Sequence, residues 1–119
     1  MEIGIDIVKI SRFQKMLNGN LSKIFTDYEI EYIKSKGVNS IQTVAGLFAC
    51  KESVLKALGL GIFSSQLFLK DIEIRHKNGK PQVEITPKLF HYINNLGLCD
   101  IKVSISHDGD YAISECIIY

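Results

Sequence analysis

The sequence predicts a single α+β domain in which a mainly antiparallel sheet packs against one long helix. Three observations support this prediction. Residues 41–58 carry the longest helical pattern, the second half of the chain holds two pairs of alternating segments joined by turn residues, and strands do not alternate with helices as in a parallel fold. The length of 119 residues suits one domain, which we expect to span residues 1–119.

The first predicted element is a strand over residues 2–7. Its apolar and polar residues alternate, as they do in a strand with one buried face. The face expected to meet the core carries three isoleucines, Ile3, Ile5 and Ile7. Asp6 lies on the opposite face and is therefore predicted to point away from the core.

Two short helices are predicted next. Apolar residues recur at helical spacing up to about Asn18, and the exposed side of this first helix carries basic residues three apart, Lys9, Arg12 and Lys15. The second helix begins at Thr26, because Thr26-x-x-Glu29 has the form of a capping box. We expect that helix to run to about Lys36.

The longest helix is predicted over residues 41–58, with Gly59 as its stop. Its apolar side chains form one arc, and Lys51 projects from inside that arc. Glu52 and Lys56 lie on the flank of the arc, one turn apart. Small side chains beside them form a smooth face against which another backbone or a ligand could lie: Ala45, Ala49 and Ser53.

The second half of the chain is expected to be richer in strands. Hairpins are predicted over residues 71–85, with Asn78-Gly79 at the turn, and over residues 101–118, with residues 107–110 at the turn. Between them, a threonine N-cap and a proline at the first helical position predict a helix over residues 87–96.

The composition limits the classes of function. The chain is 46% hydrophobic and 23% charged, with 14 Lys plus Arg against 13 Asp plus Glu and a formal net charge of +1. It therefore lacks the broad basic field that non-specific nucleic-acid binding needs, and we expect no nucleic-acid partner. Cys50, Cys99 and Cys116 are widely spaced, which is typical of reduced core residues in a cytoplasmic protein. No signal peptide and no membrane-spanning segment are expected.

Three ionisable side chains suggest chemistry when they are considered together. The first strand contributes Asp6, and the long helix contributes Glu52 and Lys56. Two carboxylates without a Cys/His cluster suit Mg²⁺, which binds few protein oxygens and completes its octahedron with water and phosphate oxygens. Zinc is disfavoured, because the histidines are scattered: His76, His91 and His107. The Gly59-Leu60-Gly61 segment is a candidate for close approach of a phosphate.

Each of these residues also has an ordinary interpretation. Glu52 and Lys56 could form a solvated surface ion pair, and Asp6 could be a surface strand residue or a helix cap. Lys51 could reach solvent along its aliphatic stem. The sequence alone leaves open whether Lys51 meets solvent, phosphate or a neighbouring subunit.

Two segments resemble the signature motifs of the phosphopantetheinyl transferases, namely Gly4-Ile5-Asp6 and Phe48-Ala49-Cys50-Lys51-Glu52-Ser53-Val54-Leu55-Lys56. The second motif is specific, because it places an aromatic residue, Lys-Glu-Ser and a further Lys at fixed offsets. The resemblance continues in order through Phe25-Thr26-x-x-Glu29, Gly59-x-Gly61-Ile62, Asn78-Gly79-Lys80-Pro81, Val103-Ser104-Ile105-Ser106-His107 and Tyr111-Ala112. The short length is similar to that of the holo-acyl-carrier-protein synthase branch.

The resemblance implies transfer of the 4′-phosphopantetheine group from coenzyme A (CoA) to a serine of apo-acyl carrier protein, in support of fatty acid biosynthesis. It also implies a magnesium-dependent homotrimer with interfacial active sites. Asp6 and Glu52 would be the metal ligands, and Lys56 and His107 would contact the CoA phosphates. Arg12 would lie at the carrier-protein docking surface.

The basic edge of the first predicted helix extends that expected docking surface to Lys9 and Lys15, since carrier proteins of this type are acidic. Gly59 and Gly61 remain candidate CoA contacts. The general base is open: Glu52 through a water, Asp6 or a metal-bound hydroxide could each deprotonate the serine.

One residue departs from the family pattern. The position before the motif's aromatic residue is commonly arginine, and here it is Leu47, so a contact that the family makes there is absent or supplied elsewhere. Two other functions are compatible with the same residues. One is a non-catalytic α+β module that binds acidic partners, and the other is a magnesium-dependent hydrolase of phosphate esters.

Overall fold

The computed structural model describes residues 1–61 and 64–119. In chain order its elements are β1 (Glu2–Lys9), the 3₁₀ helix η1 (Ile10–Phe13), α1 (Gln14–Asn18), η2 (Leu21–Lys23), α2 (Asp27–Lys34), η3 (Gly37–Asn39), α3 (Ser40–Ala57), η4 (Leu69–Asp71), β2 (Glu73–Lys77), β3 (Lys80–Glu84), α4 (Pro87–Asn95), β4 (Ile101–Asp108) and β5 (Tyr111–Ile118). The predicted α+β class and both predicted hairpins are confirmed.

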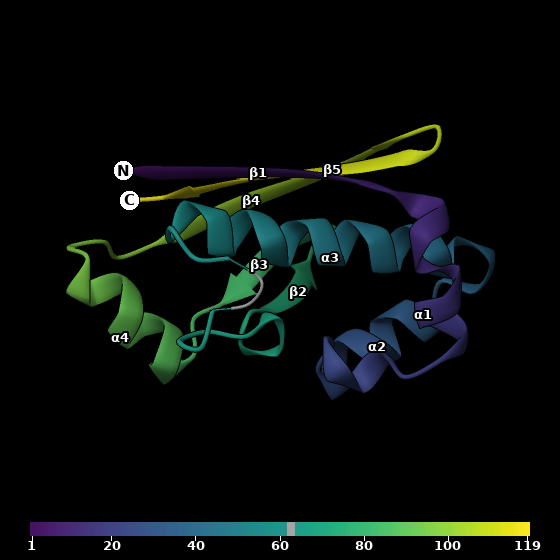
Figure 1. Cartoon of the computed structure of the whole chain (residues 1–119), viewed down its shortest axis with the longest axis horizontal. Coiled ribbons are helices and arrows are strands. Elements are labelled where there is room, and N and C mark those ends of the chain that lie inside the picture. The colour runs from purple at the N-terminus through teal and green to yellow at the C-terminus, as the bar shows by residue number, and fades with distance from the viewer. Residues whose placement is uncertain (62–63) are drawn as a thin grey trace.

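The long helix α3 lies between two β layers (Figure 1). On one side is a three-stranded antiparallel sheet in the order β1-β5-β4, and the hairpin β2-β3 forms a separate two-stranded sheet. The short helices α1 and α2 lie near one end of the molecule and α4 near the other, on the side of α3 away from the three-stranded sheet. The two termini lie close together (Figure 1).

Local sequence signals account for the ends of these elements. The capping box of α2 is formed, since the Thr26 hydroxyl accepts the Glu29 N–H and the Glu29 carboxylate accepts the Thr26 N–H. At the turn of the β2-β3 hairpin, Asn78 and Gly79 have φ angles of 53° and 78°, as an Asn-Gly turn requires. The Thr86 hydroxyl accepts the Leu89 N–H and caps α4.

The core is built around α3, from which most side chains are buried. The small-residue face predicted on this helix is real, but the chain covers it: Ala45, Ala49 and Ser53 are fully buried. The strand β1 and the strand β5 pack against α3. The small face is therefore an internal contact and gives no support for an interface between subunits.

The face of β1 that meets the core is the opposite of the one we predicted. Ile3, Ile5 and Ile7 expose 64%, 56% and 60% of their surfaces, whereas Gly4 and Val8 are buried. Alternation shows that the two faces of a strand differ, but it does not show which face meets the helix. Asp6 consequently lies on the α3 side of the sheet, and this placement is what makes a site with the helix possible.

The cysteines are free, and Cys50 and Cys116 are buried as predicted. Burial raises the pKa of each of these two thiols to about 12. The prediction that all three lie in the core is wrong for Cys99, which is exposed between α4 and β4. No helix in residues 1–61 and 64–119 combines the length and apolar character that crossing a bilayer needs.

Candidate active site

The site is built where β1 lies against α3. A β-carbon on Gly4 would come within 2.0 Å of the Ser53 carbonyl oxygen and 2.7 Å of the Ala57 backbone nitrogen. Only glycine permits an approach this close, because every other residue would push the strand away from the helix. Asp6 is two residues further along the same face of β1 and so lies beside the C-terminal half of α3.

Lys56 connects the two elements. Its ammonium donates hydrogen bonds to Asp6 Oδ1 at 3.0 Å and to the Ile5 carbonyl oxygen at 3.1 Å. The Asp6 side chain is 13% exposed and that of Lys56 is 50% exposed. The lysine head is thus held at the site but remains accessible to a ligand from solvent.

Glu52 lies one helical turn before Lys56 and is partly buried. Burial raises the pKa of its carboxyl group, the negative charge of Asp6 raises it further, and the charge of Lys56 lowers it. Asp6 Oδ2 and Glu52 Oε2 are both buried without a hydrogen-bond partner. Each carboxylate therefore keeps one oxygen for a cation.

The donor set limits the kind of cation. Among the residues that the structure describes, no group of three or more His, Cys, Asp and Glu side chains could hold a metal ion. A pair of carboxylates that leaves most coordination positions to other oxygens suits Mg²⁺ rather than Zn²⁺.

His107 is not brought to this pair within one chain. Its Nε2 lies 2.9 Å from the Gln42 carbonyl oxygen, near the beginning of α3. The ten residues from Gln42 to Glu52 span about 15 Å of helix, and β5 separates β4 from β1. A cavity of about 190 Å³ lies beside His107 and is lined by residues from several elements, including Tyr32, Gly46, Leu47, His76 and Pro81.

Leu47 is almost fully buried at this cavity, with 1% of its surface exposed. An aliphatic side chain there supplies no charge to a ligand. The described lining of this cavity contains no Lys or Arg that could take the place of the family's arginine.

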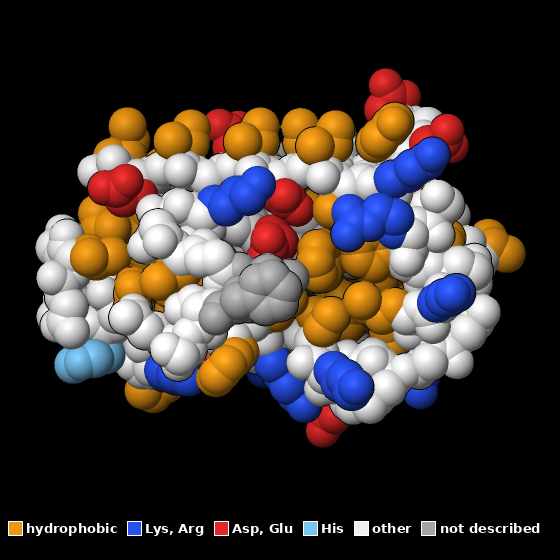
Figure 2. All heavy atoms as spheres, viewed as in Figure 1, with side chains coloured by type: hydrophobic (Ala, Val, Ile, Leu, Met, Phe, Trp, Pro, Cys, Tyr) orange, Lys and Arg blue, Asp and Glu red, His pale blue; other side chains and the backbone are white. Residues whose placement is uncertain are grey.

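The other predicted residues are placed at the surface. Gly59 ends α3 with a φ of 74°, and Gly61 follows in an open position. Ile62, part of the resemblance, lies outside the described residues. Lys9, Arg12 and Lys15 are exposed on β1, η1 and α1. On the face of the molecule shown in Figure 2, acidic side chains gather near the middle, and a hydrophobic area lies between them and the end that carries α1.

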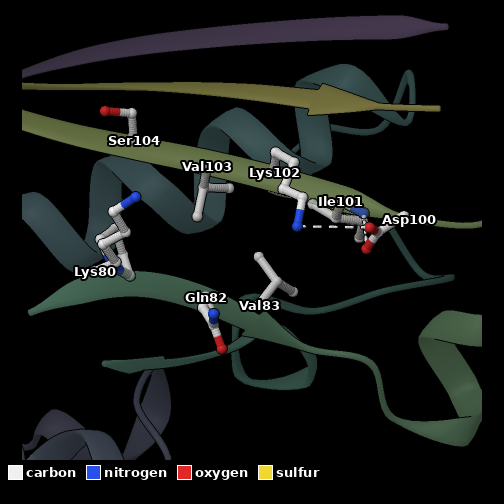
Figure 3. Close-up of a pocket in the computed structure, with 9 residues that line it drawn as sticks. Lys80, Gln82, Val83, Asp100, Ile101, Lys102, Val103 and Ser104 are labelled. Atoms are coloured by element: carbon white, nitrogen blue, oxygen red, sulfur yellow. Dashed lines mark hydrogen bonds and ion pairs between the residues drawn. The ribbon is translucent and has the colours of Figure 1, made fainter. Parts of the chain in front are cut away.

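A second cleft is lined by none of the predicted catalytic, metal-binding, CoA-binding or docking residues. It has a volume of about 610 Å³ and separates β3 from β4, with Val83 and Val103 pointing into the gap (Figure 3). Lys102 and Asp100 form an ion pair of 3.7 Å on its β4 side.

Two features of this region were not predicted, namely the partner of Lys51 and the close contact of Gly4 with α3. Lys51 neither reaches solvent nor faces an open surface, because it is fully buried against Glu29. Glu29 was identified as a capping residue, and it fills that role while also binding Lys51. The close packing of Gly4 on α3 was not predicted, although glycine in a strand interior is a known signal of close backbone approach.

The sequence model of the 4′-phosphopantetheinyl transferase superfamily matches residues 2–116. The chain belongs to this superfamily. Holo-[acyl-carrier-protein] synthase of Caldicellulosiruptor saccharolyticus is 43% identical to it over 118 residues, which cover 97% of this chain and 93% of that protein. The protein of the same name from Clostridium botulinum is 43% identical and covers 98% and 94% of the two chains.

Solved structures agree with this relationship. Holo-[acyl-carrier-protein] synthase of Helicobacter pylori in complex with coenzyme A matches with a TM-score of 0.83 at 30% identity, over 98% of this chain and 99% of that one. The Bacillus anthracis synthase in complex with CoA (3′,5′-ADP) matches with a TM-score of 0.81 at 33% identity, over 98% and 94%. These relatives narrow the class to the holo-[acyl-carrier-protein] synthases.

Proposed function

We propose that this protein transfers the 4′-phosphopantetheine group of CoA to a serine of apo-acyl carrier protein, giving holo-acyl carrier protein and adenosine 3′,5′-bisphosphate in support of fatty acid biosynthesis. One observation carries the proposal. Asp6, Glu52 and Lys56 lie together where β1 packs against α3, in a chain 43% identical to named holo-[acyl-carrier-protein] synthases over nearly its full length. One catalytic domain spans residues 1–119.

Magnesium is the metal that fits the site. Asp6 and Glu52 would hold it through the two oxygens that lack hydrogen-bond partners, and both are hard oxygen donors. When bound, Mg²⁺ supplies Lewis-acid stabilisation of charge on the diphosphate of CoA. It would also relieve the repulsion between the two carboxylates.

The reaction is a displacement at phosphorus. The serine oxygen bonds to the β-phosphorus, the bond from that phosphorus to the bridging oxygen breaks, and adenosine 3′,5′-bisphosphate leaves with the bridging oxygen. Lys56 turns its exposed ammonium from Asp6 towards the transferring phosphate and stabilises its negative charge. The serine proton passes to Asp6, or to Glu52 through a water.

CoA would be bound between subunits. His107 is remote from Asp6 in one chain, so its contact with the CoA phosphates requires a neighbouring protomer. The exposed isoleucines of β1 supply an apolar face for such an assembly, which we propose to be a homotrimer. Gly59 and Gly61, which follow α3, would let CoA approach the backbone closely.

The carrier protein would dock beside the acidic pair. Lys9, Arg12 and Lys15 are exposed at the end of the molecule that carries α1, where they complement an acidic partner. We place the enzyme in the cytoplasm, a reducing compartment compatible with three free cysteines.

One assay tests the function against its two alternatives. The full chain is incubated with CoA, Mg²⁺ and apo-acyl carrier protein, and the carrier is weighed by mass spectrometry. A gain of one phosphopantetheine group is expected, and it should disappear in Glu52→Ala but persist in Glu31→Ala, where an exposed glutamate of α2 is removed. Phosphate release without carrier would indicate a hydrolase, and no reaction of CoA would indicate a binding module.

A further inference from the structure

Lys51 is a fully buried cation in the middle of the helix that carries Glu52 and Lys56. Its side chain and that of its partner Glu29 are both 0% exposed, and their ion pair is 2.7 Å long. Burying two charges carries a large desolvation cost, which the pair and its hydrogen bonds must offset. The proposed reaction uses neither residue, so their presence needs another explanation.

All three donors of the Lys51 ammonium are used. One hydrogen bond goes to Glu29 Oε1 at 2.7 Å, and the other two go to the carbonyl oxygens of Leu69 at 3.0 Å and Ile72 at 2.5 Å. An ammonium has three donors and no acceptor, so this arrangement is complete. The three acceptors converge on one point and fix where the Lys51 side chain must end.

Glu29 is held as firmly as its partner. Its Oε1 accepts the Thr26 N–H at 2.9 Å, and its Oε2 accepts the Ile74 N–H at 2.8 Å. The pair therefore joins three parts of the chain: the beginning of α2, the segment from Leu69 to Ile74, and α3. The pair thus links α2 and α3 to the segment that leads into β2.

The position of Lys51 on α3 connects this network to the acidic site. Lys51 immediately precedes Glu52, and Ser53, the next residue, is in close contact with Gly4 of β1. Side chains reach about 5–6 Å from a helix axis, so turning the helix by about 10° moves a side-chain tip by about 1 Å. A shift of that size in a catalytic group can reduce a rate by about a hundredfold.

We propose that the buried Lys51–Glu29 pair is a positioning device, which fixes the rotation of α3 about its axis and thereby holds Glu52 at the correct distance from Asp6. The inference rests on the proposed function, because the distance matters only where the two carboxylates share a cation. Lys51 and Glu29 act through Glu52 and touch neither CoA nor metal.

The alternative is that the pair contributes only to folding stability. The two roles are separable, because replacing a buried ion pair by neutral groups of similar shape is often harmless to stability. The double variant Glu29→Gln/Lys51→Met removes both charges. The amide oxygen of Gln at position 29 can still accept one of the two backbone N–H groups that Glu29 binds.

The test measures Mn²⁺ binding to the purified full chain by electron paramagnetic resonance, with transfer to apo-acyl carrier protein measured in parallel. In the double variant we expect Mn²⁺ affinity to fall at least about tenfold and kcat to fall, while the KM for CoA changes far less. A folded double variant with wild-type Mn²⁺ affinity and wild-type kcat would show that the pair has no positioning role.

Glu29→Asp covers the case in which the double variant does not fold. It keeps both charges and shortens the carboxylate side chain by one methylene. A positioning role therefore predicts weaker Mn²⁺ binding, whereas a pair that only neutralises charge predicts unchanged Mn²⁺ binding. Ile93→Val, in the buried face of α4, is the control for lost stability and should keep its Mn²⁺ affinity. If it weakened Mn²⁺ binding as much as the pair variants do, the proposal would be refuted. A wild-type chain that neither binds Mn²⁺ nor modifies the carrier would instead refute the proposed function.

Discussion

Asp6 and Glu52 bring two negative charges together in a partly buried place, and the single positive charge of Lys56 does not cancel the repulsion between them. The repulsion is visible in the raised pKa of Glu52, to which burial contributes first and the charge of Asp6 second. We therefore expect Glu52→Gln to leave the metal-free protein at least as stable as the wild type. Mg²⁺ should raise the thermal unfolding temperature of the wild type but not of the variant, because a ligand stabilises only a state that binds it. An equal shift by Mg²⁺ in both proteins would contradict the metal assignment.

The ring of His76 predicts a pH dependence of stability. It is stacked on Tyr32 with ring centroids 4.1 Å apart, and its Nδ1 is buried without a hydrogen-bond partner. Burial first, and the charge of Lys36 second, lower the pKa of His76 below the ordinary value of 6.5. Below pH 6.5 the imidazole is therefore protonated more in the unfolded chain than in the folded protein. The contribution of His76 to stability consequently falls as the pH drops from 6.5 towards the lower pKa of the folded state.

His76→Phe keeps the stacking on Tyr32 and removes the titration. Its unfolding free energy, measured with urea between pH 7.5 and 5.5, should decline less than that of the wild type. The exposed His91 provides the control, since His91→Gln should follow the wild-type curve. Identical curves for His76→Phe and the wild type would exclude His76 as the source of the pH dependence.

Arg12 lies on the exposed basic edge that includes Lys9 and Lys15. Arg12→Glu should raise the KM for the carrier protein about tenfold or more while leaving the KM for CoA almost unchanged. The reason is that reversing a charge on the docking surface repels the acidic carrier protein, which binds there, whereas CoA binds elsewhere. The same reversal at Lys77, exposed at the end of β2, should change neither value. Equal effects of Arg12→Glu on both substrates would remove the docking role.

At the scale of the elements, the contact between β1 and α3 sets the spacing of the site. Gly4→Ala would force a β-carbon to within 2.0 Å of the Ser53 carbonyl oxygen, so the strand must move. We expect a loss of about 1–3 kcal/mol in unfolding free energy, together with a loss of transfer that exceeds what the lower stability explains.

Gly37→Ala is the matched control for this substitution. Gly37 has a φ of 55° and open space around it, so alanine there costs about 1–2 kcal/mol through backbone strain alone. That variant should unfold more easily but transfer phosphopantetheine at the wild-type rate where it is folded. If Gly4→Ala behaved in the same way, the spacing between β1 and α3 would not control the chemistry.

The sequence predicted the elements well because their ends depend on local signals. The Thr26 and Thr86 caps, the Asn78-Gly79 turn and the stop of α3 at Gly59 each follow from residues next to one another in the chain. It could not predict which face of β1 meets α3, since that depends on packing between elements distant in sequence. The partner of Lys51 could not be predicted for the same reason. Glu29 lies 22 residues away in the sequence, and its capping role already accounted for a glutamate at that position.

At the scale of the whole molecule, one face of the three-stranded sheet exposes apolar side chains that the chain does not cover. Ile3, Ile5, Ile7 and Ile113 expose between 37% and 64% of their surfaces. In the paired register, Ile7 lies opposite Ile113, so the exposed side chains are continuous across β1 and β5. Exposed apolar surface of this kind is typical of surfaces that associate, and the proposed homotrimer would bury it between identical copies.

An assembly with shared active sites predicts that two inactive variants can complement each other, which a monomer does not. If Asp6 of one protomer and His107 of its neighbour serve the same CoA molecule, Asp6→Ala and His107→Ala should each be inactive alone. When the two variants are mixed after mild unfolding and refolded together, random association should restore both residues at about a quarter of the shared sites. Transfer measured by carrier mass should recover accordingly. A mixture that stays inactive, while a wild-type sample refolded in the same way is active, would show that each site is made by one chain.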